Sequence, residues 1–258
     1  MTIKKRALLY PIIALPIIAL VTVVLLLRFG SHKLSELEYI SFQEKTEDVS
    51  YFLEMFDPEI KNDEDDTEEM TEDETKLDYL AKQTSVAAQL HFAETGEDSI
   101  ELNKAIEIIN NHFSTQVSEQ DYESELINEY LKTYNVGYDS DEKQIYFNNP
   151  YCTKQGVAVS PIDKYILTDV KRKGETYTAI YDYYQIDDPY TALNRTSQDD
   201  ITGKHSVRSY LDGRGTPIAI KELLTSENIK DITTSERSIK VTYVLSDDRI
   251  LLDTVNHK

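Results

Sequence analysis

Cysteine and glycine are scarce in this sequence, and tryptophan is absent. The single cysteine, Cys152, has no partner for an intrachain disulfide, so a fold held together by disulfides is excluded. Neither G-x-G-x-x-G nor a P-loop occurs around the eight glycines, and the sequence therefore predicts no nucleotide cofactor. G-x-S-x-G is missing as well, which removes the usual signature of a serine nucleophile on a strand-to-helix turn.

Basic residues are also few. The chain has 27 lysines and arginines against 47 aspartates and glutamates, and its formal net charge is −20. A surface of this sign repels phosphate backbones, so we expect no nucleic-acid partner. Such a charge is sufficient to explain solubility, although it would also attract cations or basic proteins.

No metal centre or catalytic group stands out. Cys152 has no histidine close to it in the sequence, and paired acids such as Asp187 and Asp188 fall in a polar segment. A glycosidase instead needs two carboxyls that face each other across a cleft. No two histidines have the ligand spacing of H-E-x-x-H, and the five are His32, His91, His112, His205 and His257. We predict no catalytic residue, no metal and no cofactor, and we expect that the protein is not an enzyme.

What the chain does contain is one long apolar run near its N-terminus. Its first residue is Ala7 and its last is Leu27, with no charge between them. A helix of that length spans about 30 Å, the thickness of the hydrocarbon core of a bilayer. The run is longer than the apolar core of a cleavable signal, and no small-residue cleavage pattern follows it. We predict a transmembrane helix over residues 7–28, with a cleaved signal as the alternative.

The charges beside this run predict its orientation. Lys4, Lys5 and Arg6 precede it, so residues 1–6 are expected to be a cytoplasmic tail. The bulk of the chain is then extracellular, and the lipid bilayer contacts the protein through the segment from Ala7 to Leu27. The expected location is the cell membrane, crossed once.

Residues 29–76 are expected to form a helical stalk followed by an acidic linker. Apolar residues recur at roughly helical spacing in the first half, and they are Leu34, Leu37, Ile40, Phe52 and Phe56. In the second half, nine of the twelve residues 63–74 are acidic. Like charges at that density keep a segment extended and solvated, and the glycine turn of a calcium-binding loop is missing.

Residues 77–258 change from helical to alternating periodicity. Apolar stripes predict helices that begin near Leu77, near Ser99 and at Ser118, with Gly96 and Gly137 ending the first and the third. Alternation then predicts strands over 144–147, 165–171, 175–186, 238–245 and 249–255, and a further strand over 229–234. Helices followed by antiparallel strands indicate an α+β fold.

Tyrosine is unusually frequent, with 18 in the chain. Five tyrosines lie within fourteen residues and form a candidate interaction surface: Tyr177, Tyr181, Tyr183, Tyr184 and Tyr190. A tyrosine ring with its polar tip suits a protein interface, but it also suits a half-wet sheet packed against helices. Both interpretations remain open from the sequence.

The strand-turn-strand units YILTDVKRKGETYTAIYDYY and SIKVTYVLSDDRILLDTV carry a resemblance in architecture. Their order after a helical block resembles the membrane-anchored extracytoplasmic domains of the nuclear-transport-factor-2-like (NTF2-like) and cystatin-like groups of Gram-positive bacteria. The resemblance covers roughly residues 77–255. It implies helices packed on a curved antiparallel sheet, in the shape of a cone.

Anchored domains of that kind resemble scaffold subunits of bacterial secretion and conjugation machines. The resemblance implies a binding or assembly protein of the cell envelope, with membrane or envelope proteins or a second copy of the chain as partners. A fold of this kind does not by itself indicate a particular reaction. The alternative from another class is a surface enzyme that acts on cell-envelope polymers, which would require a deep cleft holding a carboxylate or Cys152 beside a base.

Overall fold

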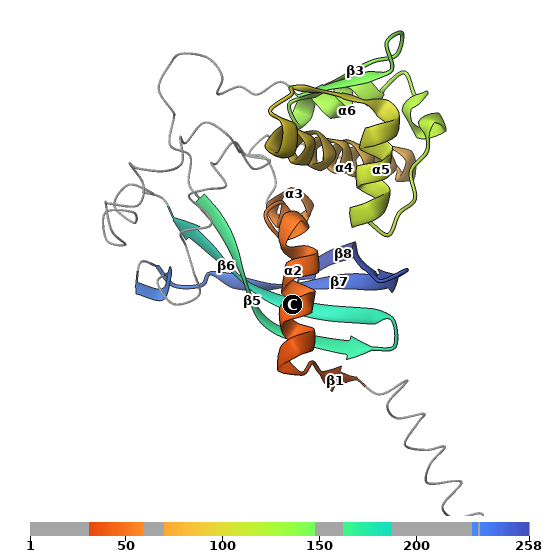
Figure 1. Ribbon diagram of the computed structural model, residues 1–258. Coiled ribbons are helices and arrows are strands. Elements are labelled where there is room, and N and C mark those ends of the chain that lie inside the picture. The colour runs from red at the N-terminus through yellow and green to blue at the C-terminus, as the bar shows by residue number, and fades with distance from the viewer. Residues whose placement is uncertain (1–30, 59–69, 148–161, 187–228, 232, 258) are drawn as a thin grey trace, which may run out of the picture.

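The computed structural model describes residues 31–58, 70–147, 162–186, 229–231 and 233–257. Within these residues the chain has an α+β fold, as the sequence predicts. The larger of the two sheets has five strands. Figure 1 shows a helix lying across this sheet and a second group of helices stacked above. We call the first group the sheet unit and the second the helical unit.

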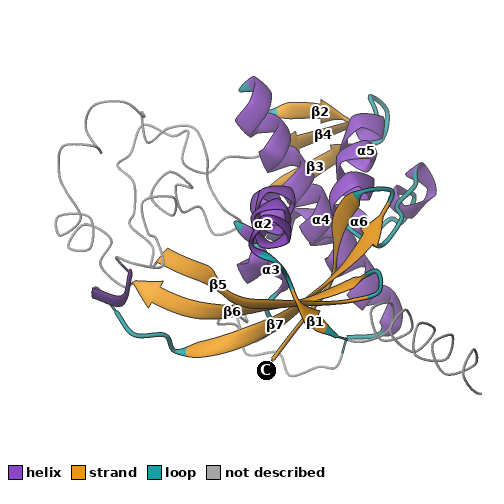
Figure 2. Cartoon of the chain, turned by 60° about the horizontal axis from the view of Figure 1, so that its bottom comes forward, coloured by secondary structure: helices purple, strands orange, loops and turns teal. Residues whose placement is uncertain are grey.

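The sheet unit is an antiparallel meander preceded by a helix. Its sheet has the order β1-β5-β6-β7-β8, with every neighbouring pair antiparallel. Figure 2 shows α2 lying on one face of this sheet. The elements are β1 (His32–Lys33), α2 (Glu36–Ser50), β5 (Ile162–Lys173), β6 (Thr176–Ile186), β7 (Arg237–Ser246) and β8 (Arg249–His257).

The helical unit combines four helices with a small sheet. Helix α4 packs against α5 and α6, and the three short strands pair antiparallel in the order β2-β4-β3. The elements are α3 (Leu53–Phe56), α4 (Glu72–Thr95), β2 (Ser99–Glu101), α5 (Leu102–His112), α6 (Ile127–Thr133), β3 (Val136–Asp139) and β4 (Gln144–Phe147).

Helix α2 is the main correction to the expected organisation. The sequence predicts a stalk over this stretch, but Phe42 and Val49 of α2 are buried in the core. The ring of Phe42 lies 5.3 Å from the rings of both Tyr177 and Tyr243 of the sheet. Burying one such side chain stabilises a fold by roughly 1.5–3 kcal/mol, so α2 is held against the sheet rather than standing free. The helix begins at a capping box made by Ser35 and Glu38.

The expected acidic linker is only partly seen. Residues 59–69 lie outside the described residues, but Glu72 and Glu74 belong to the first turn of α4 rather than to a linker. Thr71 caps this helix through a second capping box with Glu74. Negative side chains are favourable at this end because they face the positive end of the helix dipole.

The predicted end of the first helix is confirmed, but its start is wrong, because α4 begins at Glu72 and not near Leu77. Gly96 ends α4 with φ = 76°, the left-handed conformation that glycine adopts without strain. The start expected near Ser99 is also wrong, since Ser99–Glu101 is β2 and α5 begins at Leu102.

The predicted boundaries of the third helix are wrong. Ser118 does make a capping box with Asp121, but it opens a single 3-10 turn, Glu119–Tyr122. Helix α6 is short, and Gly137 lies in β3 instead of ending a helix.

The long hairpins agree with the alternating pattern. Strand β6 alternates buried and half-buried residues from Thr176 to Tyr183, and β5 and β6 meet at a turn where Gly174 has φ = 62°. The turn between β7 and β8 places Asp247 and Asp248 at positive φ, as a tight hairpin requires. The strand expected over 229–234 is wrong, because Ile229–Asp231 is a 3-10 turn. In the part of the chain that the structure describes, no helix has the length and apolarity needed to cross a bilayer. The apolar run from Ala7 to Leu27 lies outside that part.

The two units share one core. Phe56 of α3 lies 5.4 Å from Phe113, which follows α5, and Phe113 forms a parallel bridge with Leu252 of β8. The amide of Ser114 donates to the carbonyl of Leu252 at 2.8 Å, and its hydroxyl donates to the Asp253 carboxylate at 2.7 Å. These contacts fix the helical unit on the β8 side of the sheet, away from β5.

Candidate functional site

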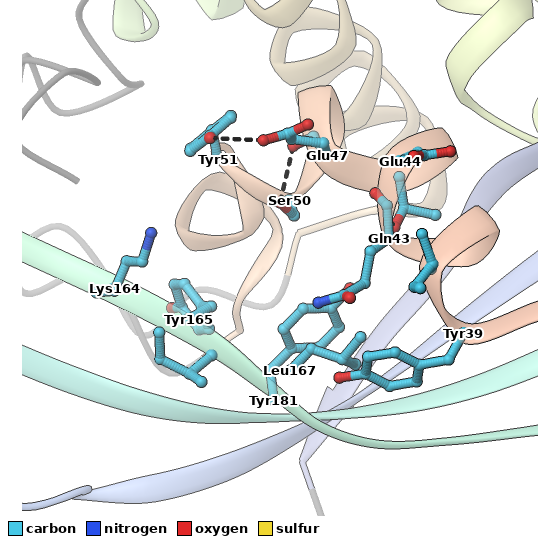
Figure 3. Close-up of a pocket in the computed structure, with 13 residues that line it drawn as sticks. Tyr39, Gln43, Glu44, Glu47, Ser50, Tyr51, Lys164, Tyr165, Leu167 and Tyr181 are labelled. Carbon is cyan, nitrogen blue, oxygen red and sulfur yellow. Dashed lines mark hydrogen bonds between the residues drawn. The ribbon is translucent and has the colours of Figure 1, made fainter. Parts of the chain in front are cut away.

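A groove of about 650 Å³ runs between α2 and strand β5. Helix α2 supplies one wall, because Phe42 turns towards the sheet and thereby orients the neighbouring residues Tyr39 and Gln43 towards β5. Figure 3 shows these two side chains above the strands, with Leu167 and Tyr181 beneath them. The helical unit covers the other end of the sheet, so this part of the sheet face is left open. The residues that line the groove are Tyr39, Ile40, Gln43, Glu44, Thr46, Glu47, Ser50, Tyr51, Lys164, Tyr165, Ile166, Leu167 and Tyr181.

The floor of the groove is aromatic and uncharged. Tyr181 donates or accepts a hydrogen bond with Tyr243 at 3.0 Å beneath it. Burial raises the pKa of Tyr181 to about 12, and burial together with the Asp169 carboxylate raises the pKa of Tyr39. Both phenols therefore stay protonated at neutral pH. The floor is therefore uncharged, and its buried tyrosines Tyr165 and Tyr181 have their hydroxyls bonded to Asp57 and Tyr243.

The rim on α2 is acidic. Glu44 and Glu47 are exposed and lie one helical turn apart on the same wall. Glu47 accepts a hydrogen bond from the Tyr51 hydroxyl at 3.2 Å, as the dashed line in Figure 3 marks. Across the groove, the Lys164 ammonium lies 5.6 Å from the centre of the Tyr51 ring. This cation–π contact holds the lysine side chain against the end of α2.

A buried polar cluster lies behind the floor. The Tyr165 hydroxyl donates to the Asp57 carboxylate at 2.8 Å, and Arg237 pairs with the same carboxylate at 2.7 Å. Arg237 also stacks 4.3 Å from the centre of the Tyr183 ring, and the Tyr183 hydroxyl donates to Asp163. Charged groups at this depth need such partners, since an isolated buried charge is very costly. The cluster joins α3, β5, β6 and β7, and so fixes the end of the groove.

The carboxylates and hydroxyls of the groove have a definite arrangement. A hydroxyl becomes a nucleophile when a base takes its proton. Ser50 donates to the main-chain carbonyl of Glu47 at 2.7 Å, and the groove hydroxyl that contacts the carboxylate of Glu47 is the phenol of Tyr51 at 3.2 Å. Glu44 and Glu47 share one wall and do not face each other across the opening, unlike the two carboxyls of a glycosidase. Ring faces, a carboxylate rim and half-exposed apolar side chains suit binding of a polar, partly apolar segment.

The expected tyrosine surface is not exposed. Tyr177, Tyr181 and Tyr183 belong to the hydrophobic core, and Tyr184 on the other face of β6 is also buried. Core packing, one of the two interpretations that the sequence leaves open, therefore describes these rings. Only Tyr181 also lines the groove, and Tyr190 lies outside the described residues.

The histidines and the cysteine do not gather. His91 is buried on α4 beside Glu97, at 3.4 Å, whereas His112 lies between α5 and α2, 3.7 Å from the Asp48 carboxylate. Cys152, His205 and the His257 side chain lie outside the described residues. Among the residues that are described, no three metal-binding side chains come together.

The sequence does not predict the groove residues, because it predicts a stalk where α2 packs on the sheet. One feature of the α2 sequence does indicate a second surface. Leu37 and Ile40 are apolar and yet lie away from Phe42 and Val49 on the helix, so α2 carries apolar residues on two faces. The structure leaves Leu37 81% exposed and Ile40 45% exposed.

Comparison with known proteins gives no relative. No protein-family model matches the chain, and neither a curated protein nor a solved structure matches it.

Proposed function

We propose that this protein is a single-pass membrane-anchored binding protein of the cell envelope, whose extracytoplasmic α+β domain holds a partner protein in the groove between α2 and β5. Its role is that of an assembly subunit, of the kind used as scaffolds in secretion or conjugation machines. The observation that carries the proposal is the open groove itself, with its aromatic floor and acidic rim.

The location rests on the N-terminal sequence. Lys4, Lys5 and Arg6 precede an uncharged run long enough to span a bilayer. The domain would then begin close to the membrane, because β1 and α2 are the first described elements after this run in the sequence. A groove wall on α2 is therefore near the attachment point, where other membrane proteins are within reach.

The element order supports the proposed NTF2-like or cystatin-like cone. One helix packs across a sheet whose strands β5, β6, β7 and β8 follow each other as a meander. The helical unit is inserted in sequence between α2 and β5. A long helix on a curved antiparallel sheet leaves a hollow beside the helix, and in this chain that hollow is the groove.

The enzyme alternative finds less support in the groove. An enzyme acting on envelope polymers needs an acid and a base on opposite sides of a bound bond. The groove carboxylates Glu44 and Glu47 instead line a single wall, and Lys164 opposite them is held over Tyr51. We therefore favour binding over catalysis.

Site-specific photo-crosslinking in membranes tests the proposal. A photo-reactive residue in place of Gln43, which is exposed and lines the groove, should capture a discrete envelope protein in intact cells. The matched control places the same residue at Glu107, an exposed position on α5 of the helical unit. Equal adducts at both positions, or none at Gln43, would contradict the proposal.

A further inference from the structure

A second pocket, of about 380 Å³, lies where helices α2, α4 and α5 meet. It shares no described lining residue with the groove between α2 and β5, so the two are separate sites. On α4 the lining residues are spaced by three and four, and on α5 by four, so each helix turns one face to the pocket. The residues that line the pocket are Asp48, Leu90, Ala93, Glu94, Ile108 and His112.

Part of this lining is apolar. Leu90 of α4 and Ile108 of α5 are half-buried and pack against the hydrophobic core, and the half-buried Ala93 lines the pocket beside them. Such side chains suit an aliphatic chain, to which they offer contact area and no hydrogen bond. The volume is at the lower end of the range of small-molecule sites. The apolar lining therefore fits a short hydrocarbon chain.

The ring of His112 is held in one tautomer. Its Nδ1 lies 2.8 Å from the main-chain carbonyl oxygen of Ile108. A carbonyl oxygen only accepts hydrogen bonds, so Nδ1 carries the proton and donates. In the neutral ring the other nitrogen, Nε2, therefore has a lone pair and no proton.

Nε2 of neutral His112 faces a second acceptor. Oδ2 of the Asp48 carboxylate lies 3.7 Å from it. Two acceptors form no hydrogen bond with each other, and each of them attracts a donor. A protonated imidazole supplies that donor itself, whereas the neutral imidazole leaves two acceptors facing each other. A cationic group with several N–H donors could donate to both.

The charges around the pocket also favour a cation. Asp48 of α2 and the exposed Glu94 of α4 are its acidic residues, and its described lining contains no lysine or arginine. Lys45 of α2 is directed elsewhere, because its ammonium donates to the carbonyl of Asp248 at 2.7 Å. A metal ion is less suitable, since no three metal-binding side chains come together in the part of the chain that the structure describes. An ammonium group needs only hydrogen-bond acceptors.

We propose that this pocket binds a primary ammonium group carried on an aliphatic chain. The ammonium donates to Nε2 of His112 and to the Asp48 carboxylate. The chain lies against Leu90 and Ile108. A free amine and a lysine side chain of another protein share this chemistry. The inference goes beyond the proposed function and does not depend on it, because it concerns a different pocket.

Titration of the full chain with n-butylamine in detergent micelles tests the site. At about pH 8.5 the amine is protonated and a histidine ring is largely neutral. In NMR spectra of protein with isotope-labelled histidines, the ring signals of His112 should shift saturably, with a dissociation constant of about 1 mM. The variant His112→Gln assigns these signals. His91, buried on α4 beside Glu97, is the internal control and should not shift.

Two analogues separate the features of the ligand. Butanol keeps the chain without the charge, and the trimethylated butylammonium ion keeps the charge without N–H donors. Each should bind about tenfold more weakly or worse than butylamine, because neither forms charge-assisted hydrogen bonds with the two acceptors. Equal binding of the trimethylated ion would mean that the negative chain simply attracts cations, and it would overturn the inference.

Three variants locate the site. Asp48→Asn should weaken butylamine by about tenfold, and the side chain is 67% exposed, so the core is not disturbed. Ala93→Phe fills the pocket and should abolish the shifts. Glu107→Gln is the control, because Glu107 is exposed on α5, does not line the pocket and changes the net charge by the same amount. Equal losses in Asp48→Asn and Glu107→Gln would also overturn the inference.

Two further probes distinguish the sources of the ammonium group. Putrescine represents a free diamine, and a lysine with capped backbone groups represents a lysine residue of another protein. Tighter binding of putrescine assigns the pocket to a free amine, and tighter binding of the capped lysine assigns it to a protein side chain. If no amine shifts the His112 signals saturably, the inference fails, while the groove, tested through crosslinking at Gln43, is unaffected.

Discussion

Helices α4 and α2 bring different kinds of side chain to the core. Helix α4 of the helical unit presents small residues that are fully or almost fully buried, among them Ala81, Ala87 and Ala88. Helix α2 instead meets the sheet through rings, as Phe42 does with Tyr177 and Tyr243. Small side chains let helices approach closely and leave little space, whereas large rings hold a helix away from a sheet and leave room beside it. The groove lies beside α2, between this helix and β5.

Buried polar groups also differ from place to place in the core. On α4 two short ones are bonded within the helical unit, Thr84 with Tyr122 at 2.7 Å and Ser85 with the carbonyl of Tyr134 at 3.0 Å. Where the end of α3 meets the sheet the pair is charged, Asp57 with Arg237. Burying a hydrogen-bonded neutral pair costs little free energy, while a buried charged pair is stable only when its partners are held in a fixed geometry. The sheet unit thus combines an open face with a rigid charged support behind it.

The largest expected effect comes from removing the ring that holds α2 on the sheet. Phe42→Ala should lower the free energy of unfolding by about 3–5 kcal/mol, because Phe42 is fully buried between Tyr177 and Tyr243. Urea unfolding followed by circular dichroism measures this. Leu37→Ala on the same helix is the control and should change stability by less than about 0.5 kcal/mol, since Leu37 is exposed. Similar losses for the two variants would mean that α2 does not pack as described.

Next in size is the charged support of the groove. Arg237→Met leaves the buried Asp57 carboxylate without its arginine and should cost about 3 kcal/mol in the same unfolding experiment. The double variant Arg237→Met with Asp57→Asn should recover part of that loss, because the uncompensated charge is gone. A double variant less stable than Arg237→Met alone would show that the carboxylate itself stabilises the fold.

Adding side-chain volume should destabilise the buried face of α4 more than the wall of the groove. Ala87→Leu adds volume to a side chain with no exposed surface on α4 and should destabilise by about 1–3 kcal/mol. Gln43→Leu adds an apolar side chain to the groove wall and should change stability by less than about 0.5 kcal/mol, since the groove has space for it. Equal effects on thermal midpoints would contradict the difference between the units.

The smallest effect is a pH-dependent link between the units. Burial lowers the pKa of His112, but the Asp48 carboxylate and the carbonyl of Ile108 outweigh it and raise the pKa above its usual value. Hydrogen bonding to His112 correspondingly lowers the pKa of Asp48. The contribution of His112 to the free energy of unfolding is fully present below the pKa of an unfolded histidine, about 6.5. It is lost as pH rises through the raised pKa of the folded state. The aspartate contribution is complete above about 3.9 and is lost as pH falls through its lowered folded value.

The pair should therefore stabilise the domain most between about pH 4 and 6.5, by less than about 1 kcal/mol because Asp48 is 67% exposed. Unfolding of the wild type and of Asp48→Asn across pH 4 to 9 measures the difference in their free energies of unfolding. This difference should shrink towards alkaline pH. A difference that is constant over this range would remove the ion pair as its cause.

The sequence predicts those parts of the fold that local patterns dictate. Alternation from Tyr177 to Tyr183 identifies β6, and the apolar stripe through Leu102 and Ile109 identifies α5, because each element buries one face. Gly96 ends α4 because its backbone adopts positive φ. These features depend on residues that are close together in the chain.

The sequence does not predict the elements that form through contacts between distant segments of the chain. Strands β2 and β3 have three and four residues, too few to show a period, and both exist because β4 pairs with them. The sequence predicts a stalk at α2 because the partners of Phe42, Tyr177 and Tyr243, come more than a hundred residues later in the chain. The groove inherits this problem, since Tyr39 and Leu167 come from distant segments and no local pattern brings them together.

Strand β1 has a mechanical consequence. In the part of the chain that the structure describes, it pairs with β5 at two positions and adds an ion pair between Lys33 and Asp169 at 3.9 Å, and it precedes helix α2. A pull on the chain before His32 therefore loads these two pairs before it reaches the capping box of α2. The strand would separate from the sheet before α2 moves, and its departure would remove the strand neighbour that β1 gives to Lys171 and Arg172.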